Sequence, residues 1–355
     1  MSNPEQGPEA TLCADAASAD GALQLIEPRE VPLGGLRAMT VRRTLPQRAR
    51  SFIGAWCFLD HYGPDDVSRT GGMDVAAHPH IGLQTASWLF SGEIEHRDSA
   101  GFHAFVRPGE LNLMTAGRGI SHSERSTPST TVLHGAQLWI ALPAHAADIA
   151  PDFAHYVPPV ITGAGWEGQV FLGELLGSAS PVPAHSPLLG AELRLAPGAS
   201  VGFPVDAAFE HGVLIDSGEA TLTRVAATGG GVSALALAQD DLGFAPAGAA
   251  ALQLTAGAAG ARVLVLGGEP MREQLIMWWN FVGRSHEEIL QARAEWQETV
   301  AAAGVADPSG SAQPQSPVAA PGPLDPKRFG LPEHEPDPPL PAPAAPVARL
   351  VPRKQ

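Results

Sequence analysis

The sequence predicts an all-β protein of two tandem barrels, followed by one short helix and a proline-rich tail. The first observation is compositional, because 39 glycines and 34 prolines in 355 residues are typical of many short strands joined by tight turns. The second is that a strand-and-turn pattern occurs twice in succession along the chain. The third is a pair of short histidine-containing motifs, which predict that the functional site lies in the first of the two units.

The first unit is expected over residues 25–147. Residues 1–24 before it are rich in Ala, Ser and Glu and are expected to be disordered. Turn signals such as Ser91-Gly92 and Pro108-Gly109 separate apolar segments that read as strands. Extended entry segments are expected at residues 31–44 and 51–59, and strands at residues 83–90, 93–97, 103–107, 111–115 and 135–142.

The second unit is expected over residues 148–268. It opens on a connector rich in Pro and Gly at residues 148–168, and its later turns echo those of the first unit. Strands are expected at residues 169–176, 192–196, 200–204, 212–216, 219–224, 233–237, 252–254 and 262–266.

A helix is expected in the extension at residues 269–303. Ser285 and Glu288 form a capping box at its start. One apolar face follows at helical spacing, made by Ile289, Ala292, Trp296 and Val300. The tail at residues 304–355 holds 14 prolines, so its middle is expected to be extended or disordered.

Charge and cysteine content exclude several function classes. The net charge is −15, from 22 basic and 37 acidic residues, so direct binding to nucleic acid is not expected. Cys13 and Cys57 are the only cysteines, which implies no disulfide framework and fits a reducing cytoplasm. No apolar run approaches the roughly 20 residues that span a bilayer, so no membrane association is expected.

The motifs His78-Pro79-His80 and His122-Ser123-Glu124 are candidates for a metal site. Residues i and i+2 of a strand face the same side, so each motif can aim two ligand groups at one point. Three imidazole nitrogens and one carboxylate oxygen suit Fe(II), Mn(II), Co(II), Ni(II), Cu(II) or Zn(II), with positions left open for a substrate. Surface loops or hydrogen-bonded core histidines are the alternative.

The second unit lacks such a motif and is expected to be free of metal. Near the corresponding position stand Glu210 and His211, and adjacent residues of a strand face opposite sides.

The stretch from His78 to Glu124 resembles the pirin family of bicupins. The string MTAGRGI at residues 114–120 and the string WCFLDHYGP at residues 56–64 are specific to this resemblance, which runs from about residue 41 to about residue 297. The resemblance implies two tandem cupin barrels. It also implies that the positions of His78, His80, His122 and Glu124 hold one divalent metal, with Fe(II) expected first.

For function, the resemblance implies either an enzyme or a regulator. Pirin-like proteins often show quercetin 2,3-dioxygenase activity, which would make a flavonol the substrate and Glu124 the base; Glu124 as a spectator ligand is the alternative. The second class is a non-enzymatic, iron-dependent regulator that acts on transcription or on metabolic enzymes through a protein partner.

Other residues are candidates for supporting roles. Three further histidines could hydrogen-bond to the metal-binding side chains, namely His96, His103 and His134. Arg118 could bind an anionic substrate or hydrogen-bond to backbone carbonyls. Packing roles are expected for Trp278, Trp279 and Cys57. Both chain ends have little apolar content, so they are expected to be dispensable for the site.

Overall fold

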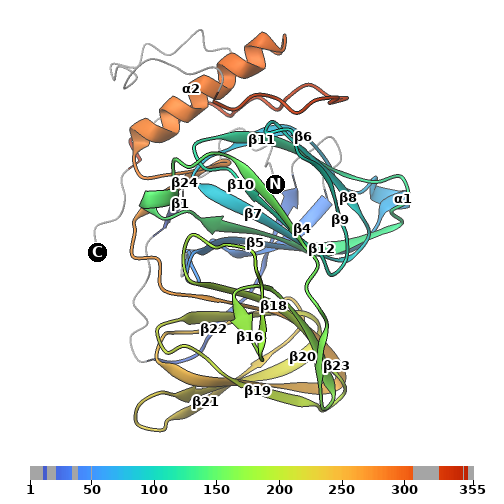
Figure 1. Cartoon of the computed structure of the whole chain (residues 1–355), viewed down its shortest axis with the longest axis vertical. Helices are drawn as coiled ribbons and strands as arrows, with labels where there is room; N and C mark the ends of the chain where they lie inside the picture. The colour runs from blue at the N-terminus through green and yellow to red at the C-terminus, as the bar shows by residue number, and fades with distance from the viewer. Residues whose placement is uncertain are drawn as a thin grey trace.

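The computed structural model describes residues 11–13, 21–33, 39–48, 50–306, 328–346 and 348–350. Two β-barrels are stacked along the long axis of the molecule (Figure 1). The longest helix and residues 328–346 lie together beyond the N-terminal barrel, on the side away from the C-terminal barrel (Figure 1). The expected all-β bicupin architecture is therefore confirmed.

The N-terminal barrel consists of a seven-stranded and a four-stranded sheet. The order of the larger sheet is β13 (Asp152–Tyr156), β10 (Leu111–Thr115), β7 (Leu83–Ser91), β12 (Val132–Ala141), β5 (Trp56–Asp66), β4 (Met39–Leu45) and β3 (Arg29–Leu33). The order of the smaller sheet is β6 (Asp74–His80), β11 (Ile120–Ser126), β8 (Ile94–Asp98) and β9 (His103–Val106). Strand β13 falls within the expected connector, so this barrel extends beyond residue 147.

The C-terminal barrel is built on one nine-stranded sheet. Its main order is β14 (Ile161–Gly163), β15 (Trp166–Leu172), β18 (Leu188–Leu195), β23 (Ala249–Gly268), β20 (Glu210–Ala226), β22 (Leu242–Ala245) and β2 (Gln24–Ile26), with β19 (Ser200–Pro204) on β23 and β21 (Val232–Leu237) on β20. A separate hairpin pairs β16 (Glu174–Leu175) with β17 (Ser178–Ala179).

One expected turn in this barrel is not a turn. The signal at residues 216–219 lies inside the continuous strand β20, where the pairing with β23 shifts register after Ile215 and again after Gly218. Two irregularities bend the strand without ending it, because a bulge absorbs extra residues while the ladder continues on either side. The segments expected as separate strands at residues 212–216 and 219–224 are therefore one strand.

The N-terminal segment also differs from expectation. Its composition predicts disorder over residues 1–24, yet β1 (Thr11–Cys13) pairs with β24 (Leu275–Trp278), which in turn pairs with β25 (Phe281–Gly283). Composition underestimates this segment because an edge strand offers unpaired backbone groups that any extended chain can use. Strand β2 then joins the sheet of the C-terminal barrel rather than that of the N-terminal one.

Disorder elsewhere at the two ends stays a prediction. Residues 1–10 and 14–20 lie outside the described residues, as do residues 307–327 in the middle of the proline-rich tail.

The helices of the described residues are α1 (Val67–Thr70), the 3-10 turn η1 (Ala144–Ala146) and α2 (His286–Ala302). The Ser285 side chain accepts a hydrogen bond from the Glu288 backbone N–H at the start of α2, as the capping box predicts. The four residues of its expected apolar face are all buried. In the described part of the chain, no helix is long and apolar enough to cross a membrane.

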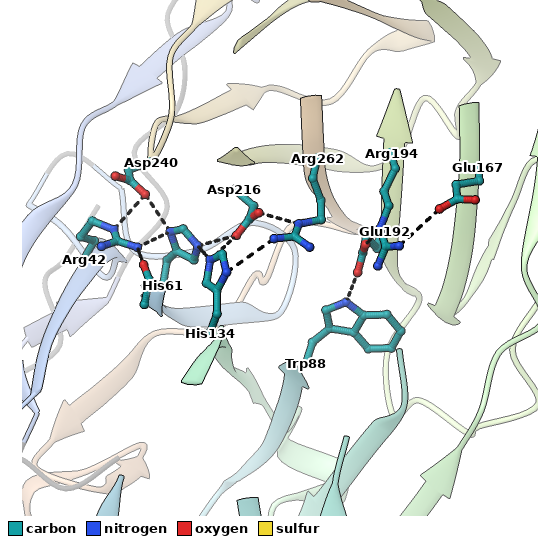
Figure 2. Close-up of polar contacts among 11 residues, drawn as sticks. Arg42, His61, Trp88, His134, Glu167, Glu192, Arg194, Asp216, Asp240 and Arg262 are labelled. Atoms are coloured by element: carbon teal, nitrogen blue, oxygen red, sulfur yellow. Dashed lines mark hydrogen bonds and ion pairs between the residues drawn. The ribbon is translucent and has the colours of Figure 1, made fainter. Parts of the chain in front are cut away.

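Apolar and polar contacts join the two barrels. One apolar cluster contains Trp88 and Leu138 from the N-terminal barrel and Phe171 and Leu264 from the C-terminal barrel. The Trp88 indole N–H donates to Glu192 Oε2 across the interface at 2.6 Å (Figure 2). A second polar group beside it links His61 and His134 of one barrel to charged residues of the other (Figure 2).

Candidate metal centre

The structure brings the two histidine motifs onto neighbouring strands. Strands β6 and β11 are antiparallel, with His122 opposite His78 and Ile120 opposite His80. The side chains of His78, His80, His122 and Glu124 are all buried, with at most 1% of each residue exposed. The alternation along each strand therefore directs the four groups into the barrel, as the sequence predicts.

The three imidazole rings lie in mutual contact. Ring centroids are 5.0 Å apart for His78 and His80, 4.4 Å for His78 and His122, and 4.9 Å for His80 and His122. One ligand nitrogen from each ring lies within 4.8 Å of the other two. The Nε2 atoms of His80 and His122 are 3.1 Å apart.

Backbone carbonyls fix the tautomers of two of these histidines. Nδ1 of His78 is 2.9 Å from the Ala76 carbonyl oxygen, and Nδ1 of His80 is 3.1 Å from the Asn280 carbonyl oxygen. A carbonyl oxygen can only accept, so each Nδ1 carries the hydrogen. Each neutral ring therefore presents a lone pair on Nε2.

A side-chain relay fixes the third tautomer. Asp98 Oδ2 is 3.1 Å from His96 Nε2, and His96 Nδ1 is 3.4 Å from His122 Nδ1. An ionised Asp98 draws the hydrogen of His96 to Nε2, so His96 Nδ1 accepts the hydrogen of His122 Nδ1. His122 Nε2 then also presents a lone pair, and it faces that of His80.

The arrangement fits a cation. Burial lowers the pKa values of His78, His80 and His122 well below the usual value, so all three are neutral at pH 7. His78 Nε2 is buried and has no hydrogen-bond partner in the described structure. Converging lone pairs with no hydrogen between them repel one another. A divalent metal bound between the three Nε2 atoms would remove this repulsion, and neutral imidazoles are common ligands of such metals.

Glu124 groups with one of the three ligand histidines, His122, and with the supporting His96, but not with His78 and His80. One of its carboxylate oxygens lies within 4.8 Å of ligand nitrogens of His122 and His96. Ser87 Oγ is 3.5 Å from Oε1, whereas the buried Oε2 has no partner within the described residues. The structure therefore groups the three expected histidines with one another and places the Glu124 carboxylate beside only one of them, His122.

Three further polar groups near the centre are not predicted from the sequence. The Tyr62 hydroxyl, Gln137 Nε2 and Trp139 Nε1 are buried and have no partner within the described residues. Burial, then the nearby Glu124 carboxylate, raises the pKa of Tyr62 well above its usual value, so this phenol keeps its hydrogen. Tyr62 stands within the family-specific string at residues 56–64, but the string does not reveal which way its side chain points.

The other candidate residues take structural positions. Of the three histidines proposed for support, His96 contacts the ligand His122, whereas His103 forms an exposed pair with Glu95 and His134 lies at the barrel interface. The Arg118 side chain is exposed, and its carbonyl accepts from Arg328 Nε at 2.5 Å. Packing roles hold for Trp278 and Cys57, which are buried.

A second His/Asp cluster lies at the barrel interface and is drawn in Figure 2. Asp216 Oδ1 is 2.8 Å from His61 Nε2 and 2.7 Å from His134 Nε2. Asp216 Oδ2 accepts from Arg262 Nε at 2.5 Å, and Asp240 bridges His61 Nδ1 and Arg42. Two guanidinium groups already supply the positive charge that a metal would bring, so hydrogen bonds alone account for this cluster.

Glu210 and His211 do not form a second metal site with each other. Glu210 accepts from the Gly54 backbone N–H at 3.0 Å and lies 3.5 Å from Arg50. Burial lowers the pKa of His211 to about 4. Neither residue belongs to a metal-type cluster in the described part of the chain.

The fold and the centre together define a bicupin with a histidine cluster in its N-terminal barrel. Residues 38–140 match the family model described as Pirin, and residues 190–302 match the model described as Pirin C-terminal cupin domain. The chain belongs to the pirin family.

Relatives and solved structures agree with this assignment. A protein of Pseudomonas aeruginosa, provisionally named quercetin 2,3-dioxygenase, is 42% identical over 300 residues, which cover 84% of this chain and 91% of that protein. A pirin-like protein of Caulobacter vibrioides is 36% identical, covering 72% of this chain and 88% of the relative. The crystal structure of a quercetin 2,3-dioxygenase from Acinetobacter baumannii matches with a TM-score of 0.78 at 34% identity, covering 94% of this chain and 99% of that one.

Proposed function

We propose that this protein binds one divalent metal, Fe(II) first among the candidates, and cleaves flavonols with O2 as a quercetin 2,3-dioxygenase. The observation that carries the proposal is the convergence of three hydrogen-free Nε2 atoms inside the barrel. The names of the relatives in Pseudomonas and Acinetobacter support the substrate class. We propose the cytoplasm as the location of the protein, because the low cysteine content fits a reducing compartment.

In this proposal, His78, His80, His122 and Glu124 would hold the metal. The three neutral imidazoles would donate through Nε2, and Glu124 would donate through one carboxylate oxygen. A bound divalent metal would supply a Lewis acid that lowers the pKa of the substrate hydroxyl and holds it in place.

Residues of the barrel would carry out the proton transfer and orient the substrate. Glu124 takes the proton of the flavonol 3-hydroxyl, because its Oε2 is the unpaired buried acceptor next to the centre. The Tyr62 hydroxyl and Gln137 Nε2 can donate to the neighbouring carbonyl oxygen of the substrate. In the overall reaction both atoms of O2 enter the product, and one ring carbon leaves as carbon monoxide.

The regulator is the second class to be tested. All four metal-site residues are buried, so a protein partner would have to sense the metal through the surface rather than touch it. The two functions therefore differ in whether a small molecule reacts inside the barrel.

One experiment separates them. The protein is purified without oxygen and loaded with Fe(II), its metal is counted, and it is mixed with quercetin and O2 while carbon monoxide is measured. The enzyme proposal expects one metal per chain and carbon monoxide in proportion to quercetin consumed. Full metal loading with no carbon monoxide from a panel of flavonols would remove the enzyme proposal and favour the regulator.

A further inference from the structure

A C-terminal segment of the chain crosses the outside of the metal centre. Residues 328–346, which we call the strap, run beside α2 and close to β6 and β11 (Figure 1). Composition alone predicts that this proline-rich end is dispensable. Its contacts argue otherwise.

The strap binds the outward face of the strand that carries two of the metal-site residues. Along β11, His122 and Glu124 face inward, so Ser121, Ser123 and Arg125 face outward. Ser121 Oγ donates to the Gly330 carbonyl oxygen at 2.9 Å. Each of the other two outward side chains also contacts the strap.

Glu335 is the centre of these contacts. The Ser123 hydroxyl donates to Glu335 Oε1, and Arg125 Nη1 donates to Glu335 Oε2 at 2.8 Å. The Glu335 side chain is only 9% exposed. Arg125 is also 3.3 Å from Asp337 of the strap and 3.2 Å from Asp74 of β6, so one guanidinium ties the strap to both ligand strands.

The strap is also fixed to the other ligand strand and to α2. The Leu340 backbone N–H donates to the Ala77 carbonyl oxygen of β6 at 2.8 Å, next to His78. The Trp296 indole N–H of α2 donates to the Leu340 carbonyl oxygen at 2.8 Å. Phe329, at 2% exposure, packs with Trp296 and Phe281.

We propose that the strap, acting through Glu335, is a positioning element that holds β6 and β11 in the alignment the metal centre needs. This inference rests on the proposed metal binding. The register between these strands shifts between His122 and Glu124, so their pairing is irregular between the two metal-site residues of β11. Contacts from outside that hold Ser123 and Arg125 fix the angle at which Glu124, the residue between them, points inward.

The test compares two substitutions in the full-length chain. Glu335→Ala removes the contacts to Ser123 and Arg125, whereas Glu333→Ala removes an exposed carboxylate two residues earlier in the same strap. Co(II) affinity is measured without oxygen by competition with a chelator, and the visible spectrum of bound Co(II) reports its coordination. Supporting contacts of this kind typically change metal affinity roughly 10- to 100-fold. We expect Glu335→Ala to bind Co(II) about 10-fold more weakly with an altered spectrum, and Glu333→Ala to match the parent.

A second measurement needs no substitution. Coupling is reciprocal, so a strap that favours metal binding must itself be held more firmly when metal is bound. Hydrogen exchange of the Leu340 amide should therefore slow on adding Co(II) to the parent protein.

The failures of the two proposals are distinguishable. A parent that takes up no Co(II) overturns the metal centre itself. A parent that binds Co(II) with the same affinity and spectrum as Glu335→Ala overturns the strap proposal alone. If Glu335→Ala does not fold, Leu340 exchange that is unchanged by Co(II) in the parent also overturns the strap proposal.

Discussion

At the scale of single residues, hydrogen position decides what the centre can do. Three histidines in contact could equally form a hydrogen-bonded core cluster. They do not here, because Ala76, Asn280 and His96 accept the Nδ1 hydrogens and leave each Nε2 bare. The acceptors behind the rings thus determine ligand character as much as the rings themselves.

Asp98→Asn should weaken metal binding by reversing the relay to His122. Asp98 Oδ1 accepts from the Ala100 and Phe102 backbone N–H groups, so an asparagine oxygen would keep that side and turn its NH2 toward His96. His96 would then carry its hydrogen on Nδ1, and His122 would be left with its hydrogen on Nε2. We expect an affinity loss of about 10- to 100-fold. Isothermal titration with Co(II) measures it, and an unchanged constant would contradict the relay.

Glu124→Gln separates a base from a spectator ligand. The amide oxygen can still approach a metal, but the amide cannot accept the substrate proton. We expect metal content to remain near one per chain while flavonol turnover falls by about 10²- to 10⁴-fold. Turnover is followed by loss of quercetin absorbance at matched metal loading. A loaded variant that is as fast as the parent would rule out the base role.

At the scale of elements, strand β20 shows how burial couples stability to pH. His211 on this strand has a pKa lowered to about 4, because burial disfavours its charged form. An unfolded histidine titrates near 6.5, so between these values the unfolded chain binds the proton and the folded chain does not. The stability contributed by the neutral ring is therefore complete above about pH 6.5 and is lost as the pH falls toward 4.

His211→Gln should flatten this pH dependence. Linkage predicts that the parent loses about 2 kcal/mol more unfolding free energy than the variant between pH 7 and pH 5. Urea unfolding of both proteins, free of metal, at the two pH values gives the difference. Equal losses would show that His211 does not titrate as its burial implies.

At the scale of the whole molecule, a buried charge cluster joins the two barrels (Figure 2). Burial opposes the charge of Asp216, but hydrogen bonds from His134 and His61 hold the pKa of this carboxyl far below its usual range. Its contribution is therefore present above the unfolded value near 3.9 and is lost only as the pH falls toward the lower folded value.

Asp216→Asn should loosen the barrel interface. The substitution leaves the Arg262 guanidinium and the two histidines without their shared carboxylate, and removing one partner of a buried ion pair costs about 3 kcal/mol. We expect a lower urea midpoint at pH 7. Glu167→Gln, which removes an exposed partner of Arg194, is the matched control and should cost less than about 1 kcal/mol. Equal stability of the two variants would mean that the cluster does not hold the barrels together.

The sequence by itself determined the fold class, the helix start at Ser285 and the four candidate metal-site residues. The fold class and the helix start depend on local rules, namely strand alternation, turn residues and capping, which act over a few residues. The four metal-site residues follow from strand alternation together with the resemblance to pirins. The continuity of strands β20 and β23 was less predictable, because their bulges contain the same residue types that form true turns. The pairing of Thr11–Cys13 with β24 likewise depends on a free edge that lies far away in the sequence.

Only the tertiary structure decided what surrounds the centre. The carbonyl behind His80 comes from Asn280, 200 residues further along the chain, and the carboxylate behind Ser123 comes from Glu335, 212 residues further along. Even the nearby His96 reaches His122 only because β8 lies next to β11 in the sheet. The physical reason is that ligand type follows from side-chain alternation along a strand, whereas hydrogen position and strand alignment follow from which distant segments pack behind that strand.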